Sequence, residues 1–188
     1  MSHASSRRGA RNLAYISMGA ALIALCAWIA VPAAIPFTLQ TFAVCLVAAL
    51  LGWRRGFAAV ALYLLLGAVG LPVFSGFSGG FGVLLGVTGG YLVGFLLTAL
   101  VVGLAAGRFG QKTGALTAAM ALGILLCYAF GTGWFVLVYT KNSGPIGLGA
   151  ALGLCVLPYL PADAAKILLA ALVCRRLSPL MKKGGFSA

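Results

Sequence analysis

Two ionisable residues of opposite charge lie close together near the C-terminal end of a very apolar sequence. Asp163 and Lys166 are three positions apart, so a helix would place them on one face. An ionisable pair at membrane depth commonly marks a functional site. We therefore predict that this pair contributes to a ligand site. The alternative is a structural ion pair, in which the two side chains bind each other and no ligand.

The rest of the chain offers little other ionisable chemistry. Asp163 is the only acidic residue, which excludes mechanisms that need paired carboxylates, such as those of glycosidases, aspartic proteases and two-metal nucleases. The five cysteines are far apart within apolar runs, and the only histidine is His3, so no metal site or disulfide framework is predicted. There is no Walker-type phosphate-binding motif. We expect a protein without enzymatic activity, metal or cofactor.

The composition indicates which elements must position the pair. Hydrophobic residues make up 63% of the 188 positions and charged residues only 7%, whereas a soluble domain has about a quarter charged. An all-α integral membrane protein is therefore predicted. The net charge of +12 does not indicate nucleic-acid binding, because the cations lie in small groups between apolar runs.

Six apolar runs are candidate transmembrane helices, since a bilayer core of about 30 Å needs roughly 20 helical residues. They are Leu13–Val31, Phe37–Gly52, Phe57–Leu71, Thr88–Gly107, Ala115–Tyr139 and Pro161–Leu177. The second and third could instead form one long helix, but that would bury Arg54 and Arg55 near the middle of the membrane. A tight turn at residues 53–56 avoids this cost. The piece Ile146–Leu157 is too short to cross and is expected at the outer face.

The distribution of cations predicts the orientation. With the N-terminus inside, the inner segments hold eleven basic residues and the outer loops hold only Lys141. We therefore predict a basic cytoplasmic leader at residues 1–12, a single six-helix domain at 13–177 and a basic cytoplasmic tail at 178–188. The alternative for the N-terminus is a cleaved secretory or twin-arginine signal, although its apolar run is long enough to span the membrane.

Polar side chains of several predicted helices converge near the outer surface, at the depth of the ion pair. They are Thr38 and Gln40 at the start of the second span, Thr88 and Tyr91 at the start of the fourth, and Trp134 and Tyr139 at the end of the fifth. A pocket at this level is predicted. The uncharged loop Pro72–Val87 could fold over it or, alternatively, pack at the membrane interface. The alternative for the aromatic residues is an interfacial belt.

Small residues form two further patterns. Gly82, Gly86, Gly90 and Gly94 repeat every four positions, which predicts close helix packing. Ala20 and Ala24 form a weaker pair in the first span, and this pair could face a partner subunit.

Four motifs together resemble one family. They are the run Ile35–Phe42 (IPFTLQTF), the run Leu62–Phe74 (LYLLLGAVGLPVF), the run Thr88–Phe95 (TGGYLVGF) and the run Leu160–Lys166 (LPADAAK). In order and spacing they are similar to the BioY family, the biotin-binding S components of energy-coupling factor (ECF) transporters. Val87 and Ala162 depart from the family pattern, which usually has proline and glycine there, but neither departure removes a polar group.

The resemblance implies a six-helix membrane protein in a prokaryotic cell membrane, with an outward-facing biotin pocket. It also implies a transmembrane coupling subunit and two cytoplasmic ATPases as partners, with Ala20 and Ala24 facing the coupling subunit. Asp163 could then accept a ureido N–H of biotin and Lys166 could meet its carboxylate. Gln40 and Thr38 could serve the remaining ureido edge or the tail, with Tyr91, Phe37 and Trp134 as walls and Thr88 nearby.

Two other functions fit the residues. The chain could be an autonomous carrier or channel for another small solute, although it lacks a chain of ionisable residues for ion coupling. It could also be a structural membrane subunit, in which the Asp163–Lys166 pair only joins helices.

Overall fold

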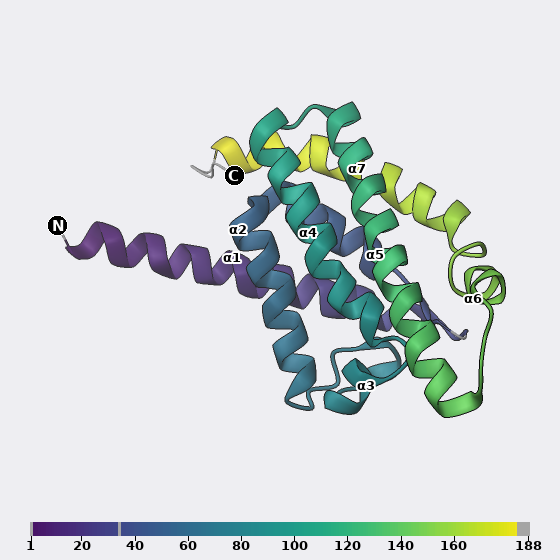
Figure 1. Ribbon diagram of the computed structural model, residues 1–188. Coiled ribbons are helices and arrows are strands. Elements are labelled where there is room, and N and C mark those ends of the chain that lie inside the picture. Colours follow the sequence, from purple (N-terminus) through teal and green to yellow (C-terminus); the bar gives the residue numbers. More distant parts are fainter. Residues whose placement is uncertain (1, 34, 184–188) are drawn as a thin grey trace.

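The computed structural model describes residues 2–33 and 35–183 and is almost entirely helical (Figure 1). Its elements are α1 (Ser2–Trp28), β1 (Ala30–Val31), β2 (Phe37–Thr38), α2 (Gln40–Ala68), the 3-10 turn η1 (Ser75–Phe77), α3 (Phe81–Leu85), α4 (Gly89–Phe109), α5 (Thr113–Ser143), α6 (Leu148–Cys155) and α7 (Leu160–Lys183). Within the described residues, four helices are long and apolar enough to cross a membrane: α1 from Gly9, α2, α4 and α5. The bent pair α6 and α7, which meet at 48°, would make a fifth.

The first and last helices extend beyond the predicted spans, into the predicted leader and tail. α1 already begins at Ser2, so the predicted leader at 1–12 is the first part of a helix that projects away from the other helices (Figure 1). α7 continues to Lys183, beyond the predicted end at Leu177, and residues 184–188 of the predicted tail lie outside the described part. Extending a formed helix requires no new nucleation, and the leader has no proline to stop it.

α2 contains two of the predicted spans and is interrupted between them. Gly52 has φ 75° and ψ 176°, a conformation that favours glycine because it has no Cβ. A Cβ on Gly56 would lie 2.8 Å from the Cα atom of Ala48, although residues eight apart in a straight helix are about 12 Å apart. α2 is therefore two helical arms that meet at a sharp bend, and the break precedes the predicted turn at 53–56 by one residue.

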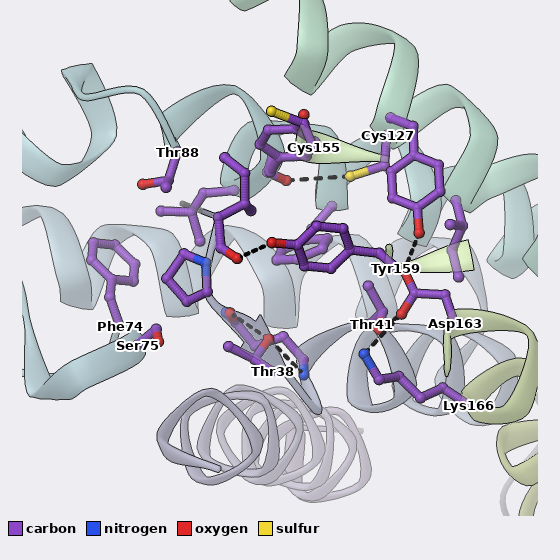
Figure 2. A pocket seen from close by; sticks show the side chains of 18 of the residues that line it. Thr38, Thr41, Phe74, Ser75, Thr88, Cys127, Cys155, Tyr159, Asp163 and Lys166 are labelled. Carbon is purple, nitrogen blue, oxygen red and sulfur yellow. Dashed lines mark hydrogen bonds and ion pairs between the residues drawn. The ribbon is translucent and has the colours of Figure 1, made fainter. Parts of the chain in front are cut away.

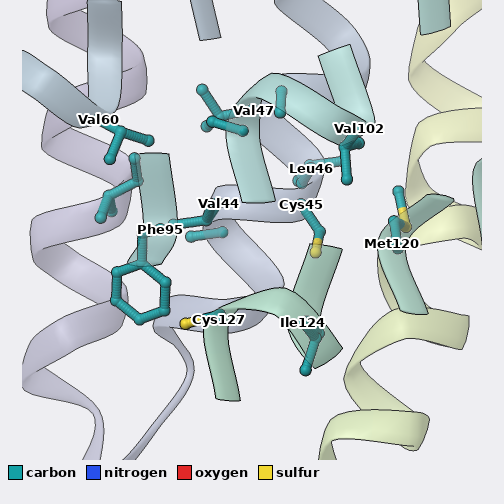
Figure 3. Packing of buried hydrophobic residues seen from close by; sticks show 14 of the residues in the cluster. Val44, Cys45, Leu46, Val47, Val60, Phe95, Val102, Met120, Ile124 and Cys127 are labelled. Atoms are coloured by element: carbon teal, nitrogen blue, oxygen red, sulfur yellow. The ribbon is translucent and has the colours of Figure 1, made fainter. Parts of the chain in front are cut away.

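The core lies where α2, α4 and α5 pack together (Figure 3). Val44 and Cys45 of α2, Val102 of α4 and Met120 of α5 are completely buried. The backbones approach closely here, because the Thr98 hydroxyl donates a 2.9 Å hydrogen bond to the Gly123 carbonyl oxygen. This packing fixes the three helices relative to one another.

The predicted glycine stripe is shared between several elements. Gly82 lies in α3 and Gly86 ends it, so only Gly90 and Gly94 belong to α4. A Cβ on Gly90 would lie 2.2 Å from Trp134 Cβ, and one on Gly94 would lie 2.8 Å from Cys127 Sγ, both on α5. The close-packing prediction therefore holds for the α4 half of the stripe. Gly82 and Gly86 do not extend this packing surface, because the chain turns between them and the start of α4.

A short antiparallel ribbon connects α1 to α2, where no strands were predicted. Ala30 pairs with Thr38 and Val31 with Phe37. Strands of two residues are too short to show an alternating pattern in the sequence. The ribbon places Phe37 and Thr38 directly in front of the first turn of α2.

Candidate ligand site

A cavity of about 150 Å³ lies among α2, α4, α5, α7 and the segment between α2 and α4 (Figure 2). By the same measure a single water needs roughly 10 to 15 Å³, so the cavity has room for a small organic molecule. Its wall is mostly apolar, with polar side chains from each of these elements: Thr38, Gln40, Thr41, Ser75, Ser78, Thr88, Tyr91, Tyr128, Tyr159, Asp163 and Lys166. Apolar walls with a few convergent polar groups are typical of small-molecule sites.

Asp163 and Lys166 face the cavity as a buried ion pair. Lys166 Nζ lies 2.8 Å from Asp163 Oδ1, and the two residues are 7% and 4% exposed. The same oxygen accepts a 2.9 Å hydrogen bond from the Thr41 hydroxyl, and Oδ2 accepts one from the Tyr128 hydroxyl. Thr41, Tyr128, Asp163 and Lys166 together form what we call the ion-pair network. The network joins α2, α5 and α7. Its hydrogen bonds and ion pair offset the free-energy cost of burying the Asp163 carboxylate away from water.

Lys166 keeps free hydrogen-bonding capacity. Its ammonium group also lies 4.1 Å from the ring centroid of Phe37, a favourable cation–π contact. An ammonium has three N–H donors, and Asp163 takes one of them. The remaining donors can serve a ligand acceptor in the cavity.

A second polar group lies at the start of α2. The Thr38 hydroxyl donates to Gln40 Oε1 at 3.2 Å, and Gln40 Nε2 donates to the Tyr63 hydroxyl at 2.6 Å. Thr38, Gln40 and Tyr63, here called the amide cluster, are all buried. Thr38 and Gln40 line the cavity, whereas Tyr63 supports Gln40 from behind. Because its two ends are held, the Gln40 amide has a defined orientation toward the cavity.

The predicted residues of α4 also reach the cavity. Thr88 and Tyr91 line it, and the Tyr91 hydroxyl is 2.9 Å from the Thr132 hydroxyl of α5. The Tyr91 ring packs so closely on α5 that a Cβ on Gly131 would lie 2.3 Å from its Cδ1 atom. Tyr91 is thus held in the wall by packing on one side and by a hydrogen bond at its end.

Two other predicted wall residues lie elsewhere. Phe37 is outside the lining but stacks on Tyr159, with ring centroids 5.9 Å apart, and lies against the Lys166 ammonium. Trp134 does not line the cavity either, and its Nε1 donates a 2.9 Å hydrogen bond to the Gly86 carbonyl oxygen. Trp134 therefore secures the entry to α4 in this structure.

The loop after α2 closes one side of the cavity. Phe74 is 1% exposed and packs edge-on against Tyr63, with centroids 5.4 Å apart. A Cβ on Gly67 would lie 2.0 Å from the Phe74 ring, so only glycine leaves room for it there. Ser78 lies in a Gly-x-Ser-x-Gly sequence that resembles a hydrolase motif, but its hydroxyl donates to the Ser75 carbonyl oxygen at 2.7 Å. The loop is therefore part of the wall.

The predicted partner surface on α1 does not agree with the structure. Ala20 and Ala24 are 2% and 8% exposed and belong to the chain's own core. A Cβ on the adjacent Gly19 would lie 3.0 Å from both Ala59 and Val47, so this face of α1 packs on α2. Small residues allow close packing within one chain as well as between chains, and the sequence pattern does not distinguish the two cases.

Several lining residues were missed by the sequence analysis. Thr41 and Tyr128 bind Asp163, and Tyr159 donates a hydrogen bond to the Ile35 carbonyl oxygen. Thr41 carried a weak signal, because it lies beside Gln40 in the second predicted span. Tyr128 lies in the middle of an apolar run, where nothing in the sequence sets it apart from a core aromatic residue.

These features define a helical membrane protein with a mostly apolar internal cavity and one buried ion pair in its wall. The BioY family model matches residues 1–183. The biotin transporter BioY of Thermotoga maritima is 42% identical over 171 residues, covering 90% of this chain and 97% of that protein. BioY of Rhodobacter capsulatus is 39% identical over 180 residues, covering 89% and 93%. The chain belongs to the BioY family.

A solved structure agrees with this assignment. The crystal structure of the S component for biotin from an ECF-type ABC transporter superposes with a TM-score of 0.81, at 26% identity and with 94% of each chain covered. The resemblance that the four motifs indicated is therefore confirmed for the chain as a whole.

Proposed function

We propose that the protein is the biotin-binding membrane subunit, or S component, of an ATP-driven ECF vitamin uptake transporter. Family membership and the relatives named as biotin transporters support this. The observation that carries the proposal is the buried Asp163–Lys166 pair, which faces a mostly apolar cavity. Biotin has matching chemistry, because it combines an apolar thioether bicycle with a polar ureido group and a carboxylated tail.

The geometry of the pair favours contact with the ureido end. A ureido group presents an N–H donor beside a carbonyl acceptor, while the carboxylate is four methylene groups away from the rings. Asp163 and Lys166 are only 2.8 Å apart, so they can engage one end of biotin but not both. Asp163 accepts a ureido N–H, and Lys166 donates to the carbonyl oxygen. This replaces the expectation that Lys166 meets the carboxylate.

The tail then extends toward the opposite end of the cavity. Ser75 and Thr88 lie there, across from Asp163 and Lys166 (Figure 2). Their hydroxyl groups are neutral donors, and the cavity lining offers no second cation. Thr38 lies between the two ends (Figure 2), and its hydroxyl donates a hydrogen bond to Gln40, which also lines the cavity. These two residues bind the part of the ureido group that the ion pair does not contact.

We further propose six membrane crossings, with both arms of α2 crossing separately about the bend at Gly52. Both termini are then cytoplasmic, as the distribution of basic residues favours, and the cavity opens to the outside of a prokaryotic cell membrane. The partners are a transmembrane coupling subunit and two cytoplasmic ATPases, which hydrolyse ATP. The chain itself carries no cofactor.

Binding measurements with purified protein test this proposal. Calorimetry should detect biotin binding, and Lys166→Met should weaken it at least 100-fold, whereas Lys141→Met, at the end of α5 outside the cavity, should not. Biotin and its neutral carboxamide should lose affinity by a similar factor on Lys166→Met, because both keep the ureido group. A loss confined to biotin would assign Lys166 to the carboxylate. No biotin binding by the wild-type chain would refute the function.

A further inference from the structure

The end of the molecule formed by the bend of α2, the α4–α5 turn and the C-terminal part of α7 is strongly basic. Five exposed cations belong to these three segments: Arg54, Arg108, Lys112, Arg175 and Arg176. The three segments lie together at the top of Figure 1, away from α3 and the loop that closes the cavity. We propose that this basic end binds the phosphate headgroup of an anionic phospholipid.

Gln111 joins the three segments. Its side-chain Nε2 donates a 3.1 Å hydrogen bond to the Ala49 carbonyl oxygen in α2, and its Oε1 accepts one of 2.9 Å from the Cys174 thiol in α7. Lys112 follows Gln111 directly, and Arg175 follows Cys174 directly. Lys112 and Arg175, which are 63 positions apart in the sequence, therefore belong to segments that a single side chain joins.

Arg54 and Arg108 belong to the same surface. A Cβ on Gly103 would lie 2.4 Å from the Cα atom of Trp53, so α4 crosses directly over the bend of α2. Arg54 is the next residue after Trp53, and Arg108 is five residues, about 7.5 Å of helix, beyond Gly103. The backbone contacts therefore hold both guanidinium-bearing positions near the Gln111 junction.

No acidic side chain neutralises this surface. The only acidic side chain of the sequence is Asp163, which is paired with Lys166 at the cavity. An acidic group from outside the chain would balance these basic side chains. Basic clusters next to membrane-spanning helices attract acidic headgroups, with about 1 kcal/mol for each Lys or Arg near the surface.

Aromatic side chains favour a lipid over an acidic protein as the source of that charge. Trp53 and Phe109 are 42% and 50% exposed and adjoin Arg54 and Arg108 in the sequence. The Arg54 guanidinium lies 5.1 Å from the Trp53 ring centroid, which combines a cation and an apolar ring in one exposed unit. Such pairs suit the boundary between headgroups and acyl chains, where aromatic residues of membrane proteins concentrate.

Native mass spectrometry of the full chain in an uncharged detergent tests the proposal. Dioleoyl-phosphatidylglycerol should bind at least tenfold more tightly than dioleoyl-phosphatidylcholine, and Lys112→Gln should reduce this preference about fivefold, which corresponds to about 1 kcal/mol per cation. Lys141→Gln is the matched control, since it removes the same charge from the other end of α5. Retained biotin binding by both variants would show that they are folded.

The proposal would be overturned by equal binding of the two lipids, by an equal effect of the two lysine substitutions, or by displacement of phosphatidylglycerol by soluble polyglutamate at low concentration. The last would assign the surface to an acidic protein. Soluble glycerol 3-phosphate should compete poorly, because it lacks the acyl chains that Trp53 and Phe109 would contact. If it displaces the lipid as effectively as phosphatidylglycerol does, the site binds free phosphate compounds.

Discussion

The ion-pair network and the amide cluster both present polar groups to the cavity, but they differ in how their polar groups are compensated. The network holds two full charges, and three donors surround the Asp163 carboxylate. The amide cluster is neutral and relies on one hydrogen bond at each end of Gln40. A buried charge that loses its partner costs far more than a neutral group that loses one. Substitutions in the network should therefore have much larger effects than matched substitutions in the cluster.

The largest effect is expected for Asp163→Ala, because it leaves the buried ammonium of Lys166 without a counter-charge. We expect biotin affinity to fall more than 100-fold and the free energy of unfolding to fall by about 3 to 5 kcal/mol. Calorimetry and thermal unfolding in detergent measure the two quantities.

The double variant Asp163→Ala/Lys166→Met separates a ligand site from a structural pair. Removing both charges should recover most of the lost stability, because no uncompensated charge remains, while biotin binding stays absent. A double variant that binds biotin like the wild type would show that the pair only holds α7 in place.

A smaller effect is expected for Tyr128→Phe, which removes one hydroxyl donor from the Asp163 carboxylate. Hydrogen bonds to charged groups contribute about 1.5 to 3 kcal/mol, so biotin affinity should fall roughly 10- to 100-fold. Tyr139→Phe is the control on the same helix, because the Tyr139 ring stacks on Phe135 away from the cavity. Equal affinities of the two variants would remove Tyr128 from the binding network.

The same chemical change in the amide cluster sharpens the comparison. Tyr63→Phe removes the hydroxyl that accepts a hydrogen bond from Gln40, and a neutral hydrogen bond contributes about 1 kcal/mol, so affinity should fall only about fivefold. Tyr63 is fully buried and does not line the cavity, so direct ligand contact does not complicate the measurement. A larger loss for Tyr63→Phe than for Tyr128→Phe would reverse the ranking of the two regions.

The sequence predicted these two regions unequally. The spacing of Asp163 and Lys166 was sufficient to place them on one helix face, and Thr38 and Gln40 stood out as polar residues at the start of an apolar run. Tyr128 and Tyr63 did not stand out, because an aromatic residue within an apolar helix has the same local pattern whether its hydroxyl binds a carboxylate, an amide or nothing. Their roles depend on contacts between positions 23 to 35 residues apart.

The fold shows the same division. The break near residue 52 was predictable because two arginines would otherwise be buried in the membrane, and Gly52 provides the unusual φ angle. The burial of Ala20 and Ala24 was not predictable, because a small-residue pattern indicates close packing without naming the partner. Local sequence thus specified where helices run and bend, and tertiary contacts decided which faces meet.

The smallest effect on binding is expected for Trp134→Phe. Trp134 does not line the cavity: its Nε1 donates a hydrogen bond to the Gly86 carbonyl oxygen, and a Cβ on Gly90 would lie only 2.2 Å from its Cβ. Phenylalanine keeps most of the ring packing but loses one neutral hydrogen bond, so stability should fall by about 1 kcal/mol and biotin affinity by less than twofold.

Gly86 lies only two positions before Thr88, which lines the cavity, so a shift of this segment is the route by which a larger effect could arise. Measuring affinity for biotin and its carboxamide separates the two cases. A shifted Thr88 would weaken the tail contact and affect biotin more than the carboxamide, whereas a direct wall contact of Trp134 with the rings would weaken both ligands equally.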